Sequence, residues 1–270
     1  CLVGSEMCIR DRNIGDAMEY NKEEFEKQYR MIYESLIKEN VSLEKRCVIF
    51  LGGQPGSGKS TFVEQDDVFL HYIRINGDEY RKFHPHYKDI VTYDIDNMPE
   101  RTQSFVNECV ERLIMDLSNA GYNLIIEGTL RNPEITISTC NMLKEKGYRA
   151  DLYVMAVDAA TSWESTINRA KLSREVGSIP RLVPIDKYNF IVNHFVENVD
   201  IIEKSSCFDG IHVVDRNSKE LYPCSSKTAA EVLKEHIGIE KWNSKFEETA
   251  DAFIDTKMEV LQSQRHRRGR

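Results

Sequence analysis

The chain has 270 residues, of which 41% are hydrophobic and 30% charged, and its formal net charge is −8. This length and apolar content suffice for one α/β domain of generous size with helical additions. The negative charge argues against a nucleic-acid partner, and no run approaches the ~20 apolar residues of a membrane helix. Seven cysteines without a C-x-x-C pair indicate reduced, mostly buried thiols in a cytoplasmic protein.

The two ends differ from the sequence between them. Residues 1–12 lack the cationic start and long apolar core of a signal peptide, and they look like translated adaptor sequence, so we interpret them as a non-native leader. The basic run from Arg265 to Arg270 is typical of a solvated tail.

Apolar periodicity predicts helices that alternate with short strands. An amphipathic helix over Asn21–Asn40 comes first. Strands are then expected over 47–51, 71–76, 123–126, 150–157 and 210–214. Helices are expected over 98–120, 133–146, 161–174, 185–204 and from 228 onward. This alternation predicts an α/β fold with a mostly parallel sheet, helices on both faces, and N- and C-terminal helical extensions around one globular domain.

A glycine-rich segment follows the first predicted strand with the pattern G-x-x-x-x-G-K-S. Backbone N–H groups in such a loop, at a helix N-terminus, point at phosphate oxygens. Lys59 would reach the β- and γ-phosphates, and the Ser60 hydroxyl would hold Mg²⁺. A chance glycine-rich turn is the alternative. The predicted nucleotide-binding residues are Gly53, Gln54, Pro55, Gly56, Ser57, Gly58, Lys59, Ser60 and Thr61.

Acidic side chains follow several predicted strands, where ligands of open α/β sheets bind. Asp78 is the best-placed proton acceptor for phosphoryl transfer to a hydroxyl, although capping the following helix is an ordinary use of Asp. Glu127 could hold Mg²⁺ through water or bind an acceptor hydroxyl. Asp158 and Asp215 also end apolar runs and compete for the Mg²⁺ role.

The segment from Thr161 to Pro184 is a candidate lid, because a helix there leads into a stretch rich in glycine and proline. It carries Arg169, Arg174 and Arg181, which could neutralise charge on a transferred phosphoryl group. A solvated helix face is the alternative for each arginine, and for Arg174 it is the preferred one.

The sequence resembles the zeta toxins over roughly residues 20–225. The resemblance rests on the P-loop with the preceding FLG, on Asp78 followed by His84-Pro85, on GYNLIIEGT (121–129), and on Lys146-Gly147-Tyr148 with the strand after it. It implies a P-loop kinase fold over residues 13–240, followed by a helical extension and basic tail over 241–270. The implied reaction is ATP- and Mg²⁺-dependent phosphorylation of UDP-N-acetylglucosamine by a toxin that a small helical antitoxin inhibits.

The resemblance also implies roles for individual residues. Asp78 would be the base acting on the 3′-hydroxyl of the amino sugar. Lys59, Arg169 and Arg181 would stabilise the transferring phosphate. The implied contacts with the UDP-sugar are His84, Glu111, Thr129, Arg131 and Thr139, and we add Glu127 from its place at a strand end.

Two other functions stay open at the level of sequence. One is a P-loop kinase for another nucleotide sugar or small hydroxyl acceptor, which would keep the donor site and change the acceptor pocket. The other is a nucleotide switch or binding module without transferase chemistry. A GTPase switch would carry D-x-x-G and N-K-x-D motifs, and the chain contains neither.

Overall fold

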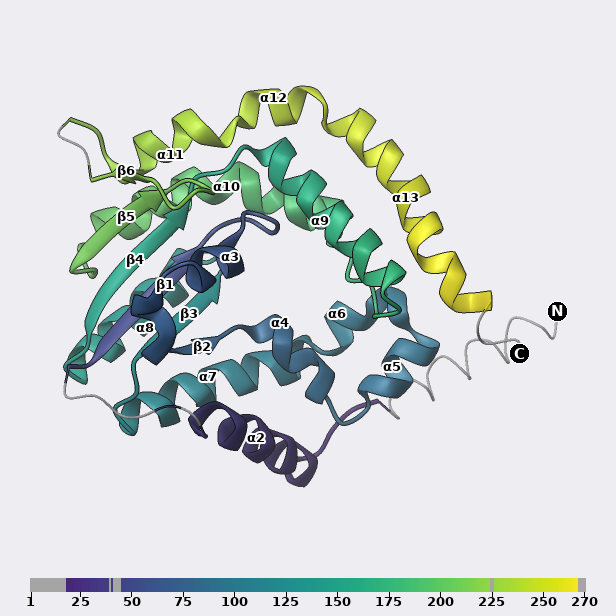
Figure 1. Ribbon diagram of the computed structural model, residues 1–270, viewed down its shortest axis with the longest axis horizontal. Helices are drawn as coiled ribbons and strands as arrows, with labels where there is room; N and C mark the ends of the chain where they lie inside the picture. Colours follow the sequence, from purple (N-terminus) through teal and green to yellow (C-terminus); the bar gives the residue numbers. More distant parts are fainter. Residues whose placement is uncertain (1–17, 39, 41–44, 224–225, 267–270) are drawn as a thin grey trace. The chain divides into compact units, whose positions relative to one another are not determined.

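The computed structural model describes residues 18–38, 40, 45–223 and 226–266, so the predicted leader lies outside the described residues (Figure 1). The chain forms two compact units. The first unit combines residues up to Arg46 with His71–Ile125, and the second combines Cys47–Leu70 with the chain from Ile126 onward. The predicted boundary at residue 12 lies outside the described residues, and the one at residue 240 stays a prediction.

Six strands form a sheet in the order β2-β3-β1-β4-β5-β6. β1 pairs in parallel with β4, β4 pairs in parallel with β5, and β6 runs antiparallel to β5. The predicted α/β fold with a mostly parallel sheet is confirmed. The strand bounds are Cys47–Gly52 (β1), Ile73–Ile75 (β2), Leu124–Gly128 (β3), Arg149–Met155 (β4), Gly210–Val214 (β5) and Glu220–Tyr222 (β6).

Helices α2 and α7 pack against each other in the first unit (Figure 1). Phe25 of α2 meets Phe105 of α7 edge-on, with ring centroids 5.6 Å apart. The helix predicted over 98–120 is divided at Thr102, whose hydroxyl donates to the Met98 carbonyl. The helices of this unit are α2 (Lys22–Ile37), α4 (Gly77–Tyr80), α5 (Tyr87–Tyr93), α6 (Met98–Arg101) and α7 (Gln103–Asn119), with 3-10 turns Arg81–Phe83 and Ile95–Asn97.

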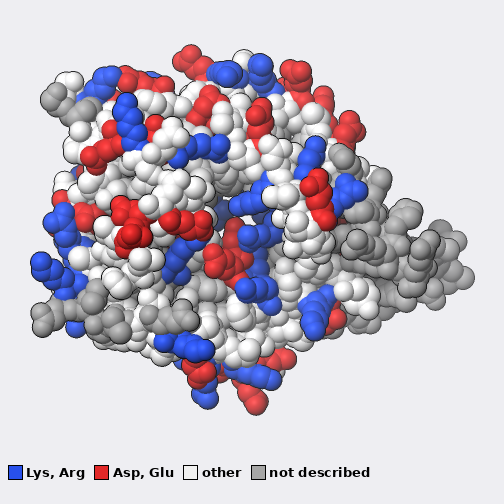
Figure 2. Space-filling view, in the orientation of Figure 1, with Lys and Arg blue, Asp and Glu red and all other residues white. Residues whose placement is uncertain are grey.

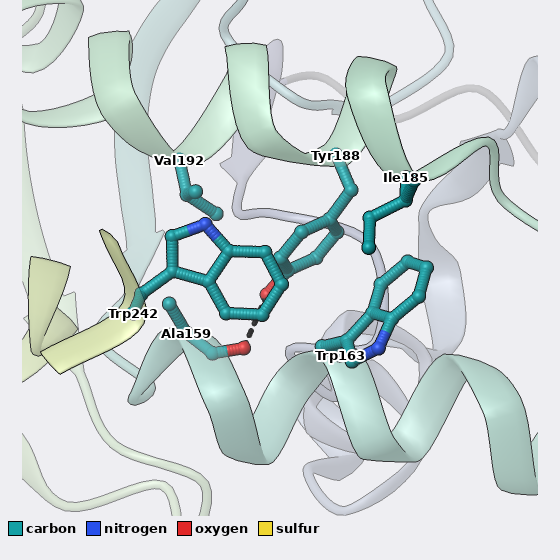
Figure 3. Packing of buried hydrophobic residues seen from close by; sticks show 6 residues of the cluster. All are labelled: Ala159, Trp163, Ile185, Tyr188, Val192 and Trp242. Atoms are coloured by element: carbon teal, nitrogen blue, oxygen red, sulfur yellow. Dashed lines mark hydrogen bonds between the residues drawn. The ribbon is translucent and has the colours of Figure 1, made fainter. Parts of the chain in front are cut away.

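An aromatic cluster forms one core of the second unit (Figure 3). Trp163 and Tyr188 pack with Trp242, and ring centroids lie 5.1 Å apart in the Trp163–Tyr188 and Tyr188–Trp242 pairs. The helices of this unit are α3 (Lys59–Glu64), α8 (Pro133–Glu145), α9 (Ala159–Glu175), α10 (Ile185–Lys204), α11 (Ala229–Ile237), α12 (Ile239–Ser244) and α13 (Phe246–His266), with a 3-10 helix at Asp67–His71. Residues of α12 and α13 thus belong to a packed core, because Trp242 of α12 is buried in this cluster and Phe246 and Phe253 of α13 pack against it.

Charged side chains of both signs are interspersed on the face shown in Figure 2. Among the described residues, no helix combines the length and the apolar character needed to cross a membrane. Three of the four cysteines in the described ranges are buried, as expected for core thiols. Burial raises the pKa of the Cys109 thiol to about 12, so this side chain is a poor nucleophile at neutral pH.

Candidate active site

The glycine-rich segment joins β1 to α3, as the motif predicts. Gly56 and Gly58 have φ angles of 79° and 93°, in the left-handed region that favours glycine. A Cβ at Gly56 would overlap the carbonyl oxygen of Ser162 on α9. Glycine at this position therefore permits both the turn of the loop and the close packing of α9 against it.

Lys59 opens α3 and folds back over the loop. Its ammonium donates to the carbonyl oxygens of Gly53 at 2.6 Å and Gln54 at 3.3 Å. Ser60 follows in the first turn of α3, where its side chain is exposed. A cation on the loop and a hydroxyl beside it are the groups that a phosphate chain with Mg²⁺ uses in P-loop proteins.

Gln54 ties the loop to the rest of the second unit. Its side chain is fully buried, and Nε2 donates to the Val157 carbonyl at 2.7 Å and to Ser162 Oγ at 3.1 Å. Ser162 is hydrogen-bonded in turn to the Tyr188 hydroxyl. That hydroxyl donates to the Ala159 carbonyl at 2.6 Å (Figure 3). This buried chain connects the loop to α9 and α10, and its contacts come from distant parts of the sequence.

Arg216 is a loop contact that the sequence interpretation missed. It lies in the turn between β5 and β6, and its Nη2 donates to the Gly56 carbonyl and to Ser165 Oγ, the latter at 2.8 Å. Ser165 stands one helical turn before Arg169 on α9, so Arg216 links the loop to the helix that carries this predicted catalytic residue. In the sequence, the only indication of this contact is that Arg216 directly follows an Asp at the end of a predicted strand.

The structure assigns capping roles to the two acids that competed for Mg²⁺. Asp158 caps α9, since its Oδ1 accepts from the Thr161 backbone N–H at 3.0 Å. Asp215 Oδ1 accepts from the backbone N–H groups of Asn217 at 2.8 Å and Lys219 at 2.9 Å. Both carboxylates therefore hold local backbone, a use that accounts for their positions after strands.

The predicted lid consists of most of α9 and the segment that joins it to α10. Arg169 lies exposed on α9, and Arg181 lies half-buried in the connecting segment. Arg174 lies in the last turn of α9, where a cation favours the negative end of the helix dipole. This placement fits the preferred structural interpretation of Arg174.

The chain after β3 carries the predicted acceptor contacts of the second unit. Glu127 belongs to β3 itself and is half-buried. Thr129 and Arg131 lie in the connection to α8, and Thr139 lies on α8. Asn132 caps that helix by accepting from the Ile135 N–H at 3.3 Å.

Asp78 is not the helix cap, so the structural alternative for this residue is wrong. Asn76 caps α4, and its Oδ1 accepts from the Asp78 backbone N–H at 3.1 Å. Arg81 Nε donates to Asp78 Oδ1 at 2.9 Å. Arg81 Nη1 donates to the Pro99 carbonyl at 2.9 Å and to Thr102 Oγ1 at 2.8 Å, and Nη2 donates to Gln103 Oε1 at 3.0 Å. The carboxylate is thereby oriented by an anchored guanidinium, which sequence reasoning had missed.

His84 is buried among aromatic rings of the first unit. Burial, with a smaller contribution from nearby His86, lowers the pKa of His84 to about 4, so the imidazole is neutral at pH 7. The Phe105 ring on α7 lies 5.4 Å from it, and Nδ1 accepts from the His86 N–H at 3.2 Å. The Nε2 atom therefore carries the proton and acts as a donor.

Helix α7 connects the three predicted residues of the first unit. Gly77, beside Asp78, packs so closely on α7 that a Cβ would lie 2.8 Å from Val106 Cγ1. Val110 lines the same contact, and exposed Glu111 follows it on the helix. Helix α7 thus carries Glu111 and packs against the segments that hold Asp78 and His84.

A glycine-rich loop between a buried strand and a helix, in a mostly parallel sheet, defines a P-loop kinase-like α/β protein. The zeta toxin family model matches residues 33–227, and the chain belongs to that family. The predicted resemblance is confirmed.

The similar proteins agree with this assignment. Toxin PezT of Streptococcus pneumoniae serotype 4 is 32% identical over 225 residues, covering 82% of this chain and 89% of PezT. Toxin zeta of Streptococcus pyogenes is 29% identical, covering 77% of this chain and 74% of that protein. A structure from the PezAT toxin–antitoxin system of S. pneumoniae superposes with a TM-score of 0.73 at 31% identity, over 91% of this chain and 99% of that one. The AvrRxo1-ORF1:ORF2 complex matches at a TM-score of 0.54 and 12% identity, which concerns the fold alone.

Proposed function

We propose that this chain is the toxin of a toxin–antitoxin system and acts as an ATP-dependent kinase. Its proposed substrate is UDP-N-acetylglucosamine, phosphorylated on the 3′-hydroxyl of the amino sugar in the cytoplasm. The observation that carries the proposal is Asp78, a carboxylate that follows a strand, does not cap its helix and is oriented by anchored Arg81. A binding module has no use for such a group, whereas transfer to a hydroxyl requires one.

The donor half of the reaction uses the loop from Gly53 to Ser60. Its backbone N–H groups and Lys59 would bind the phosphates of ATP, and the Ser60 hydroxyl would help to hold Mg²⁺, which prefers oxygen donors. Mg²⁺, when bound, neutralises charge on the phosphates. Arg169 and Arg181 add positive charge toward the transferred group, as phosphoryl transfer requires.

The acceptor half begins with Asp78, whose carboxylate accepts the proton of the attacking hydroxyl. Arg81 holds Asp78 Oδ1 through its Nε and so limits the rotation of the carboxylate. Neutral His84 offers a hydrogen-bond donor without adding charge. The remaining proposed contacts with the UDP-sugar are Glu111, Glu127, Thr129, Arg131 and Thr139.

The partner in this proposal is a small helical antitoxin. Support comes from the relatives: the matched PezT structure belongs to a study of the PezAT toxin–antitoxin system. A kinase acting on a cell-wall precursor would slow growth, so a cell tolerates such a gene only when an inhibitor keeps the kinase inactive. A kinase for another nucleotide sugar, without a toxin role, is the second candidate and shares the whole donor half.

The test is incubation of the protein with ATP, Mg²⁺ and a panel of nucleotide sugars, followed by mass spectrometry. A gain of one phosphate by UDP-N-acetylglucosamine supports the proposal. Transfer to a different sugar of the panel would replace the proposed substrate, and no transfer to any of them would refute the assignment as a nucleotide-sugar kinase.

Three variants test whether the activity depends on the proposed site residues. Lys59→Ala should lose nucleotide turnover, and Asp78→Asn should keep ATP binding and lose transfer. Asp89→Asn is the matched control, because Asp89 is an exposed acid in the first turn of α5. Induced expression of wild type and Asp78→Asn in a bacterial host tests toxicity, and equal growth of the two cultures would contradict the toxin role.

A further inference from the structure

The connection between β3 and α8 contains a residue in an unfavourable backbone conformation. Leu130 has a φ of 50°, in the left-handed region that residues other than glycine rarely adopt. It separates Thr129 from Arg131, two of the proposed acceptor contacts. Such a conformation persists only where surrounding contacts hold it in place, and it is often found where a site needs a fixed geometry.

The Leu130 side chain supplies the first of these contacts. It is buried, with 6% of its surface exposed, and it lies against Gly52, the last residue of β1. A Cβ on Gly52 would overlap Leu130 Cδ1. The absence of a side chain at position 52 therefore creates the space that Leu130 fills, directly before the phosphate-binding loop.

Asn198 supplies the second contact from the middle of α10. Its Nδ2 donates to the Leu130 carbonyl at 3.0 Å and to the Arg131 carbonyl at 3.2 Å. Only 9% of Asn198 is exposed, and it stands among the buried apolar residues Phe195, Val199 and Ile202. A polar side chain on the apolar face of a helix is costly to bury unless it makes hydrogen bonds, which here go to two successive carbonyls.

These bonds require an amide. One nitrogen must carry two hydrogens directed at two oxygens, which an asparagine provides and an aspartate of the same size does not. A carboxylate at this position would instead face two carbonyl oxygens with negative charge. Replacement by aspartate thus changes the polarity of the contact while nearly preserving its volume.

We propose that Asn198 and Leu130 are positioning residues for acceptor recognition. Together they hold the backbone between Thr129 and Arg131 in a single conformation, so that both side chains project from fixed points. The inference rests on the proposed function, since it assigns the acceptor to these two residues. It adds α10 to the parts of the fold that contribute to acceptor binding.

The test compares Asn198→Asp with Asn193→Asp in the full chain. Asn193 lies exposed on the same helix, so the control repeats the chemical change away from the β3–α8 connection. Steady-state kinetics would vary ATP and UDP-N-acetylglucosamine separately, with thermal melting as a measure of folding. Asn198→Asp should raise the KM for the acceptor by about tenfold or more, the equivalent of one misplaced hydrogen bond, and leave the KM for ATP within about twofold.

Leu130→Ala keeps the proposal testable if Asn198→Asp does not fold. Removing the side chain that lies on Gly52 should loosen the backbone between Thr129 and Arg131 and raise the KM for UDP-N-acetylglucosamine, with the KM for ATP within about twofold.

The outcomes separate the inference from the proposed function. An active wild type whose Asn198→Asp and Leu130→Ala variants both keep the wild-type KM for the acceptor overturns the inference alone. Equal increases in both KM values together with a lower melting temperature reduce Asn198 to a structural role and also overturn it. A wild type that phosphorylates none of the sugars overturns the proposed function and the inference with it.

Discussion

Acidification should destabilise this protein through His84. The ordinary pKa of a histidine is 6.5, and in the folded protein burial lowers the pKa of His84 to about 4. Between these two values the unfolded chain binds a proton that the folded chain does not, so stability falls as the pH falls. From about pH 7.5 to about pH 5 this linkage lowers the free energy of unfolding by about 2 kcal/mol, as follows from the two pKa values.

Urea unfolding at both pH values, followed by circular dichroism, measures this effect. Carboxylates also titrate in this range, so the informative quantity is the difference between wild type and His84→Gln. Glutamine is polar and has no charge to gain, and His84→Gln should therefore lose about 2 kcal/mol less than wild type on acidification. His71→Gln, at an exposed histidine, is the control. Identical pH dependence in wild type and His84→Gln would show that the folded imidazole is not held neutral.

Three further substitutions test the contacts around the site. Arg81→Ala should lower kcat by about tenfold or more with ATP affinity unchanged, because Asp78 loses its orienting partner, and an unchanged kcat would contradict that role. Arg216→Ala should raise the KM for ATP several-fold with little change in melting temperature, and a normal KM would exclude a role in holding the loop. Trp242→Ala should lower the free energy of unfolding by about 3–5 kcal/mol, measured by urea, while a loss below about 1 kcal/mol would show that the aromatic cluster adds little.

The sequence predicted the elements whose pattern is long or strongly apolar. The helix from Ile185 to Lys204 repeats apolar residues with helical spacing over its whole length, and its predicted and observed bounds agree. The P-loop could also be predicted from the sequence, because its backbone shape depends on glycines at fixed positions. In both cases the information is local, so no knowledge of distant contacts was needed.

Short elements were missed because they contain too few residues to show a repeating pattern of apolar side chains. β6 has three residues, Glu220–Tyr222, and is specified by its antiparallel pairing with β5 rather than by its own composition. The predicted second strand began too early, since Asp67–His71 forms a 3-10 helix before β2.

The nearby sequence already indicated that Asp78 does not cap the helix, and this signal was overlooked. Asn76 precedes it by two residues and is among the residues preferred at helix N-caps, so its presence already provided a cap. The orienting role of Arg81 was not accessible in the same way. It depends on Pro99 and Thr102, about twenty residues further along the chain, and only folding brings these groups to the guanidinium.

The residues after the predicted division at 240 pack against helices of the kinase core. Helix α12 begins at Ile239, and Trp242 lies just beyond the division with 2% of its surface exposed. Its indole N–H donates to Asn189 Oδ1 on α10 at 2.8 Å, and Phe253 of α13 packs on Trp163 of α9. Because α9 carries Arg169, residues that follow the family match at 227 support the helix that holds a proposed catalytic side chain. Removal of the chain after residue 240 would expose one face of this cluster, so the segment after 240 is part of the fold that sustains the site.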